Sequence, residues 1–195
     1  MKYVFIDTEF TGEHAFTTLV SVGLVTLTGE QLYITLNDYD KTQVTNWLKK
    51  NVLNKIDQKK SVSKKKAYLE ISSFLESYSQ NEEICLVSAG KTHDMILLFQ
   101  LFHQNSKNNK FFHFLHDLPD YLNHNKHLDL NTMFSLAGIK IGNKEQCQYS
   151  CRDQYADIEL KKENHNALYD ARIVKECFLK LVENSILKGL IHFES

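Results

Sequence analysis

The chain has 195 residues, of which 43% are apolar and 24% are charged. This composition is typical of a folded domain of ordinary size, and it excludes a disordered chain or a protein embedded in a membrane. With a formal net charge of -1 the chain has no global basic field of the kind that indicates a nucleic-acid binder, although bound divalent cations can reverse the local sign at an acidic nucleic-acid site.

We expect one domain over residues 1–195, because no linker, repeat or low-complexity segment interrupts the sequence. The four cysteines are too few for a disulfide scaffold. The N-terminus lacks the features of a secretory signal, and no apolar run approaches the length that spans a membrane. A cytoplasmic protein without membrane contact is therefore expected.

The first predicted strand ends in two carboxylates. Val4, Phe5 and Ile6 form a continuous apolar run, which favours a strand that is buried on both faces. Asp7 and Glu9 follow two residues apart, so their side chains project from the same face if the strand continues. Ionised carboxylates on one face repel each other, and Mg²⁺ or Mn²⁺ is the usual way to hold both. The alternative is that Asp7 caps a turn and Glu9 is solvated.

Two more strands and two helices are predicted before residue 80. The runs 19–27 and 32–36 flank a polar Thr-Gly-Glu turn, which predicts a tight antiparallel hairpin. Apolar residues at helical spacing then predict helices within 44–53 and 67–78. Trp47 is one of the apolar positions of the first of these helices.

A cluster of lysines surrounds the connection between these two helices. A solvated helical face is the preferred interpretation, and a track for a phosphate backbone is the alternative. The cluster consists of Lys49, Lys50, Lys55, Lys59, Lys60, Lys64, Lys65 and Lys66.

The second half of the chain alternates strands with helices. Residues 84–88 predict another buried strand, followed by a helix with Asp94 near its start. On its own, Asp94 would be an N-cap or a first-turn charge. Residues 127–130 predict a fifth strand, and Gly138 would close the short helix that follows. A long C-terminal helix is predicted over 167–187.

The predicted order is three antiparallel strands, helices, a strand, a helix, a strand and a helix. This order resembles the ribonuclease H-like fold, an α/β architecture. The resemblance implies a five-stranded mixed sheet flanked by helices, with three antiparallel strands followed by two parallel ones. The first strand would lie at the centre, beside the fourth. Residues 139–152 show little periodicity and are predicted to be loop.

Four acids and one histidine recur near the ends of these elements. In chain order they are Asp7, Glu9, Asp94, His165 and Asp170. Together they resemble the motifs of the DEDDh family of 3′-to-5′ exonucleases. Residues 7–12 (DTEFTG) are most similar to oligoribonuclease and ribonuclease T, and residues 165–172 (HNALYDAR) are the strongest single match. The resemblance spans most of the chain, with the motifs in the family's order.

The second of these motifs departs from the family pattern. The family usually carries an asparagine a few residues before this aspartate, whereas the chain reads Ser88-Ala-Gly-Lys-Thr-His-Asp94. Asp129, at the predicted fifth strand, is the competing candidate. Asp94 is preferred because it falls between a buried strand and an amphipathic helix, where the family places this acid.

The resemblance implies hydrolysis of phosphodiester bonds with two Mg²⁺ ions roughly 3.5 to 4 Å apart, which Mn²⁺ can replace. Asp7 would bridge both ions. Glu9 and Asp170 would complete the coordination of the first ion, and Asp94 would help to hold the second. His165 would take the proton of the attacking water, since an unperturbed histidine has a pKa near roughly 6.5. An exposed histidine at the entry to the helix is the alternative.

Phe10, Thr11 and Gly12 complete the predicted site as substrate-binding residues. Phe10 lies next to the metal pair, where its ring could stack on a terminal base, and core packing is its alternative role. The implied function is removal of nucleoside 5′-monophosphates from the 3′ end of single-stranded nucleic acid, with RNA favoured. The alternatives are a DNA exonuclease of the proofreading type and an inactive relative that binds nucleic acid. Such relatives are often homodimers, so dimerisation is expected.

Overall fold

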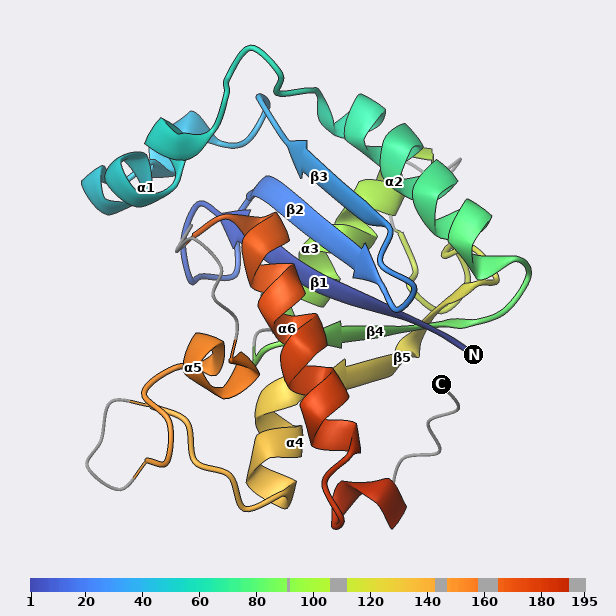
Figure 1. Cartoon of the computed structure of the whole chain (residues 1–195). Coiled ribbons are helices and arrows are strands. Elements are labelled where there is room, and N and C mark those ends of the chain that lie inside the picture. Colours follow the sequence, from blue (N-terminus) through green and yellow to red (C-terminus); the bar gives the residue numbers. More distant parts are fainter. Residues whose placement is uncertain (91, 106–111, 143–146, 158–164, 190–195) are drawn as a thin grey trace.

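The structure is a computed structural model that describes residues 1–90, 92–105, 112–142, 147–157 and 165–189. Its centre is a five-stranded sheet with the order β3-β2-β1-β4-β5 (Figure 1). The strands are β1 (Lys2–Phe10), β2 (Leu19–Thr26), β3 (Gln31–Thr35), β4 (Ile84–Ser88) and β5 (Leu122–Asp129). The first three strands pair antiparallel, and β4 pairs parallel with both β1 and β5. The predicted ribonuclease H-like arrangement is confirmed.

Helices cover both faces of this sheet. They are α1 (Asn46–Asn51), α2 (Lys64–Ser79), α3 (Thr92–Phe102), α4 (Leu130–Leu136), α5 (Arg152–Ala156) and α6 (Ala167–Val182). Short 3-10 turns follow at η1 (Lys41–Gln43), η2 (Leu53–Lys55), η3 (His103–Asn105) and η4 (Leu187–Gly189). Figure 1 shows α6 crossing β1 and β2 on one face of the sheet, with α3 behind the sheet. None of the helices in the described ranges is long and apolar enough to cross a membrane.

The central strand β1 supplies side chains to two separate cores. Tyr3 and Phe5 face α6, where both rings lie 5.3 Å from the ring of Phe178. Val4 and Ile6 face the opposite side and pack with residues of α2 and α3. All four β1 side chains are buried, so the prediction of a strand buried on both faces is confirmed.

Some element boundaries differ from the predicted ones because local hydrogen bonds compete with regular structure. The C-terminal helix ends at Val182, before the predicted end at residue 187. The Asn184 side chain accepts the Ile186 backbone N–H at 3.0 Å, and this hydrogen bond forms a turn where the helix would otherwise continue. β5 begins at Leu122, five residues before the predicted start at His127. Its pairing with β4 shifts register along this stretch, so the strand lacks the regular alternation that would have revealed it.

Gly23 of β2 allows the last helix to approach the sheet closely. It lies opposite Asp7 in the register between β1 and β2. A Cβ atom at Gly23 would lie 2.3 Å from the carbonyl carbon and oxygen of Ala167, the first residue of α6. Only glycine permits this approach of backbone to backbone. The contact fixes the start of α6 directly over the acidic end of β1.

Candidate active site

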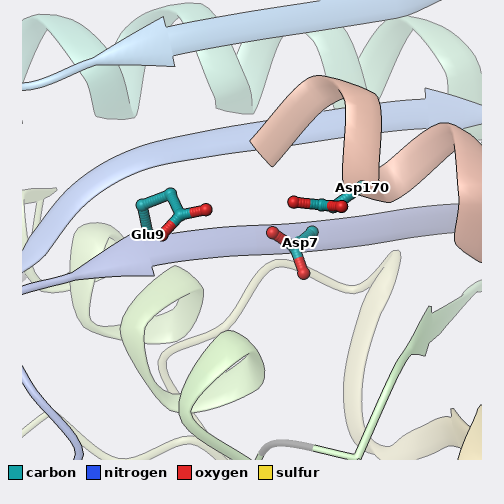
Figure 2. Close-up of side chains that lie close together, drawn as sticks. All are labelled: Asp7, Glu9 and Asp170. Atoms are coloured by element: carbon teal, nitrogen blue, oxygen red, sulfur yellow. The ribbon is translucent and has the colours of Figure 1, made fainter. Parts of the chain in front are cut away.

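The end of β1 and the start of α6 bring three carboxylates together. Asp7 and Glu9 lie on β1, and Asp170 lies in the first turn of α6. One carboxylate oxygen of each residue lies within 4.8 Å of the others. Figure 2 shows the three carboxyl groups directed toward a common space. Among the described residues, this is the one group of three or more side chains that could hold a metal ion.

Asn166 explains why α6 begins at this place. Its side chain accepts hydrogen bonds from the backbone N–H groups of Leu168 at 3.1 Å and Tyr169 at 3.2 Å, so it caps the helix. The cap puts Asp170 in the first turn, on the side of the helix that faces Asp7. The backbone N–H of His165 donates to the Asp170 carboxylate, which ties the segment before the helix to the acidic group.

Burial and mutual repulsion perturb the titration of the Asp7 carboxyl. Burial is the larger cause, and it raises the pKa of Asp7 well above the usual range. The nearby carboxylates of Asp94, Asp170 and Glu9 raise it further. The guanidinium of Arg152 acts in the opposite direction. A bound divalent cation would supply the positive charge that this group of acids needs at neutral pH.

The pKa of Asp170 is raised as well. Burial raises its pKa from the ordinary 3.8 to about 6, and Asp153 adds to the increase. Arg152 opposes the shift, as do the hydrogen bond from His165 and the ammonium group of Lys55. The carboxylate is therefore held in the folded protein at a cost in free energy, as expected for a metal ligand without its metal.

We expect Asp170→Asn to stabilise the metal-free protein at neutral pH. A carboxyl whose pKa is raised on folding favours the folded state below its unfolded pKa and disfavours it once ionised. The free energy of unfolding of the wild type should therefore fall between pH 4 and pH 6, by up to about 3 kcal/mol. The variant should lack the contribution of Asp170, so its free energy of unfolding should fall less over this range, with the contribution of Asp7 remaining. Urea unfolding in chelator across this pH range measures both proteins, and equal slopes would contradict the prediction.

The three carboxylates lie in a cleft of about 680 Å³. Residues of β1 and the loop after it form one side of the cleft, and Trp47 of α1 and Arg152 of α5 also line it. This volume falls within the range of roughly 300–1,000 Å³ that is common for small-ligand sites, so a terminal nucleotide can enter.

His165 also lines this cleft. It precedes the cap of α6 and adopts a left-handed backbone conformation with φ of 63°. Its ring meets the ring of Trp47 edge to face, with 4.9 Å between the ring centroids. The structure thus places the predicted histidine beside Asp170, at the same opening as Asp7 and Glu9.

The two candidates for the remaining acid have different environments. Asp94 is buried in α3, and its Oδ1 accepts the Thr8 backbone N–H at 3.1 Å and the Thr8 hydroxyl at 2.6 Å. It lies near enough to raise the pKa of Asp7, but it is outside the group of three carboxylates. Asp129 caps α4 by accepting the N–H and hydroxyl of Thr132, and it also accepts the Gly90 N–H. Its oxygens thus hold backbone in place, which favours Asp94 as the fourth acid.

The predicted substrate-binding residues have unequal access to the cleft. Phe10 lines it, and its ring stacks on His93 of α3 with 5.0 Å between centroids. Thr11 is 3% exposed, and its hydroxyl is hydrogen-bonded to Gln43 at 2.5 Å. The Gly12 N–H donates to the Thr17 hydroxyl at 3.1 Å. Thr11 and Gly12 therefore brace the loop that forms the rim of the cleft.

The sequence reasoning missed three residues of this site. Trp47 was interpreted as one of the apolar positions of a helix, but it is 56% exposed and lines the cleft. Lys55, interpreted as part of a solvated face, lies near enough to Asp170 to lower its pKa. Arg152 had no assigned role. The available signals were that Trp47 is the only tryptophan and that Arg152 is one of two arginines.

Solved structures with the same architecture place the fold among the exonucleases. S. pombe Pop2p, in a form with Mg²⁺ and Mn²⁺ bound, is 15% identical with a TM-score of 0.60 over 95% of this chain and 84% of that one. A full-length 3′-exonuclease is 12% identical with a TM-score of 0.61 over 95% and 83%. Cell-death related nuclease 4 (CRN-4) is 13% identical with a TM-score of 0.66 over 95% and 65%. The chain shares the ribonuclease H-like fold of these structures.

A family model gives the more specific assignment. The chain belongs to the family of 3′-5′ exoribonuclease Rv2179c-like domains, whose model matches residues 2–182. No curated protein matches the sequence significantly. The family and the fold together support a 3′-5′ exonuclease, as the motifs predicted.

Proposed function

We propose that the protein is a divalent-metal-dependent 3′-5′ exoribonuclease of the DEDDh type. It removes nucleoside 5′-monophosphates one at a time from the 3′ end of single-stranded RNA. The observation that carries this proposal is the convergence of Asp7, Glu9 and Asp170 from β1 and α6 in one cleft that His165 also lines. The family to which the chain belongs supports the choice of RNA.

The acidic group has the chemistry of a site for Mg²⁺ or Mn²⁺. Hard cations take carboxylate oxygens, and burial together with nearby acids raises the pKa values of Asp7 and Asp170, an effect that a bound cation would oppose. We assign Asp7, Glu9 and Asp170 as direct ligands and Asp94 as a supporting acid. When bound, two such ions would polarise the scissile phosphate, acidify a water molecule and stabilise the leaving 3′ oxygen.

His165 is assigned as the general base. Its ring lines the cleft and is bounded on one side by Trp47, so a ring nitrogen can accept a proton from a water molecule. The water oxygen forms the new bond to phosphorus, the bond from phosphorus to the upstream 3′ oxygen breaks, and that oxygen takes a proton from solvent and leaves as a hydroxyl. His165 returns its proton to the solvent afterwards. The hydrogen bond from the His165 backbone to Asp170 fixes the position of the general base relative to the acids.

The side walls of the cleft suit a terminal nucleotide. Trp47 is exposed on α1, and an aromatic ring in this position can stack on a base of any identity. Phe10 also lines the cleft. We assign both as contacts to the terminal base. The homodimer that the resemblance implies forms part of the same proposal.

A cleavage assay that compares RNA with DNA tests the proposed function. We expect 5′-labelled single-stranded RNA to give a ladder that shortens from the 3′ end in Mg²⁺, and no products in chelator. DNA of the same sequence should be cut more slowly. Restoration of activity by added Mn²⁺ after chelation tests the requirement for the metal.

Each other outcome selects a different function. Faster cleavage of DNA would identify a DNA exonuclease. Binding of the oligonucleotide without cleavage would identify an inactive relative. Internal fragments instead of a ladder, or unchanged activity in chelator, would contradict the proposal itself.

A further inference from the structure

A second groove continues directly from the active-site cleft. It has a volume of about 890 Å³, and it shares Ala89, Cys151, Arg152 and Asp153 with the cleft. Its other described walls come from α4 and from the segment after it, which includes Lys140. Neither the motifs nor the proposed chemistry assigns a role to this groove.

The lining of the groove suits a nucleic-acid strand. Ile139 and Ile141 offer partly exposed apolar surface, and Lys140 and Arg152 offer positive charge. Among the described residues that line it, Asp153 is the one acid, and its carboxylate accepts the Tyr169 hydroxyl at 3.0 Å.

Arg152 marks the junction between the cleft and the groove. It begins α5, and its Nη1 donates to the carbonyl oxygen of Ala89 at 3.1 Å, which ties the side chain to the end of β4. The backbone oxygen of Arg152 accepts the Cys177 thiol of α6 at 3.4 Å. The guanidinium is thus held at a fixed place, as a residue that positions a phosphate must be.

Among the carboxylates that the structure describes, none forms an ion pair with Arg152. It lowers the pKa of both Asp7 and Asp170, so it lies close to the acids. Within the described part of the chain, however, no carboxylate lies within 4 Å of it. The remaining donors of its planar fork suit the oxygens of a phosphate.

We propose that this groove binds the nucleotides upstream of the scissile bond and that Arg152 holds their first backbone phosphate. The inference rests on the proposed exonuclease function. In an enzyme that acts at a 3′ end, nothing extends beyond the terminal nucleotide, so a groove that continues from the site can hold only the upstream part of the strand. The ligand class is a single-stranded oligonucleotide longer than one residue.

Two substrates separate this role from a general effect on catalysis. The p-nitrophenyl ester of uridine 5′-monophosphate contains the terminal nucleotide and the scissile phosphate but no upstream nucleotide. An RNA tetramer contains both. We expect Arg152→Gln to reduce kcat/KM for the tetramer at least tenfold more than for the ester, mainly through KM. Arg172→Gln is the matched control, because the other arginine of the chain binds Gln31 on β3.

Salt dependence gives a readout that a merely structural role would not change. The loss of one phosphate contact to a single strand reduces the slope of log affinity against log salt by about 0.7. Tetramer binding can be measured by fluorescence anisotropy in an Asp7→Asn background. If Arg152→Gln fails to fold, Lys140→Ala, on the exposed rim of the groove, should show the same selective loss for the tetramer.

Equal losses on the tetramer and the ester would overturn the proposal, because Arg152 would then act on the scissile phosphate or on the fold. Unchanged tetramer kinetics and an unchanged salt slope would also overturn it. Failure of the proposed function looks different. In that case the wild type hydrolyses neither substrate, while the salt slope still reports whether Arg152 contacts the strand.

Discussion

Replacing Asp7 by asparagine is expected to lower the rate of RNA cleavage by at least roughly 10³-fold, equivalent to about 4 kcal/mol of transition-state stabilisation. Asp7 lies at the centre of the acidic group, since Asp94, Asp170 and Glu9 all act on its titration. Asparagine keeps the shape of the side chain and removes its charge, so a divalent cation loses its central ligand. Single-turnover cleavage of 5′-labelled RNA in Mg²⁺ measures the loss.

Metal binding provides an independent measurement for the same variant. Trp47 is the only tryptophan of the chain and lines the cleft, so quenching of its fluorescence by Mn²⁺ reports on the site. We expect quenching in the wild type and little in Asp7→Asn. Asp120→Asn, at an exposed acid before β5, is the control and should behave as the wild type. An Asp7→Asn protein that keeps a tenth of the activity would contradict the assignment of Asp7.

The second large effect is expected at a residue without functional groups. Gly23→Ala places a methyl group 2.3 Å from the carbonyl carbon and oxygen of Ala167. These two atoms belong to the backbone, so they cannot rotate away as a side chain could. The start of α6 must move, and Asp170 and His165 move with it. Overpacking of this kind costs about 1–3 kcal/mol of stability. A displacement of about 1 Å in a catalytic group can lower the rate roughly 10²-fold.

A second variant separates the loss of stability from the displacement of the helix. Val25 is buried on the same strand and faces the same core, so Val25→Ala leaves a cavity without pushing α6 away. We expect Val25→Ala to lower the unfolding midpoint to a similar extent and to keep near-normal kcat below that midpoint. Equal kcat for Gly23→Ala and Val25→Ala would show that Gly23 does not position the site.

The acids of the site could be predicted because they lie on regular elements with strong signals. The apolar run before Asp7 identifies β1, and the period of two along a strand puts Glu9 on the same face. Asn166 and the helical spacing after it identify the start of α6, which fixes the position of Asp170. That these two elements meet was implied by the resemblance of the element order to the ribonuclease H-like fold.

The walls of the site could not be predicted because they depend on tertiary contacts. α1 and α5 are short helices of six and five residues, too short for periodicity to define them. In its described residues, 139–142 and 147–152, the predicted loop contains no helix before Arg152, but Arg152 gains its place only when α5 packs on α6. Asp94 and Asp129 also look alike in sequence, since each lies near the start of a helix that follows a strand. The burial of Asp94 and its closeness to Asp7 distinguish them in the folded protein.

The placement of the acids on β1 and α6 has a consequence for how such an enzyme can diversify. Phe178 of α6 packs on Tyr3 and Phe5 of β1, so the elements that carry the chemistry also carry the main core. Trp47 lies on α1, whose buried residue Leu48 belongs to a separate small cluster, so α1 can change without loss of this core. Natural variation can therefore alter which strand ends are accepted while the hydrolytic centre stays constant.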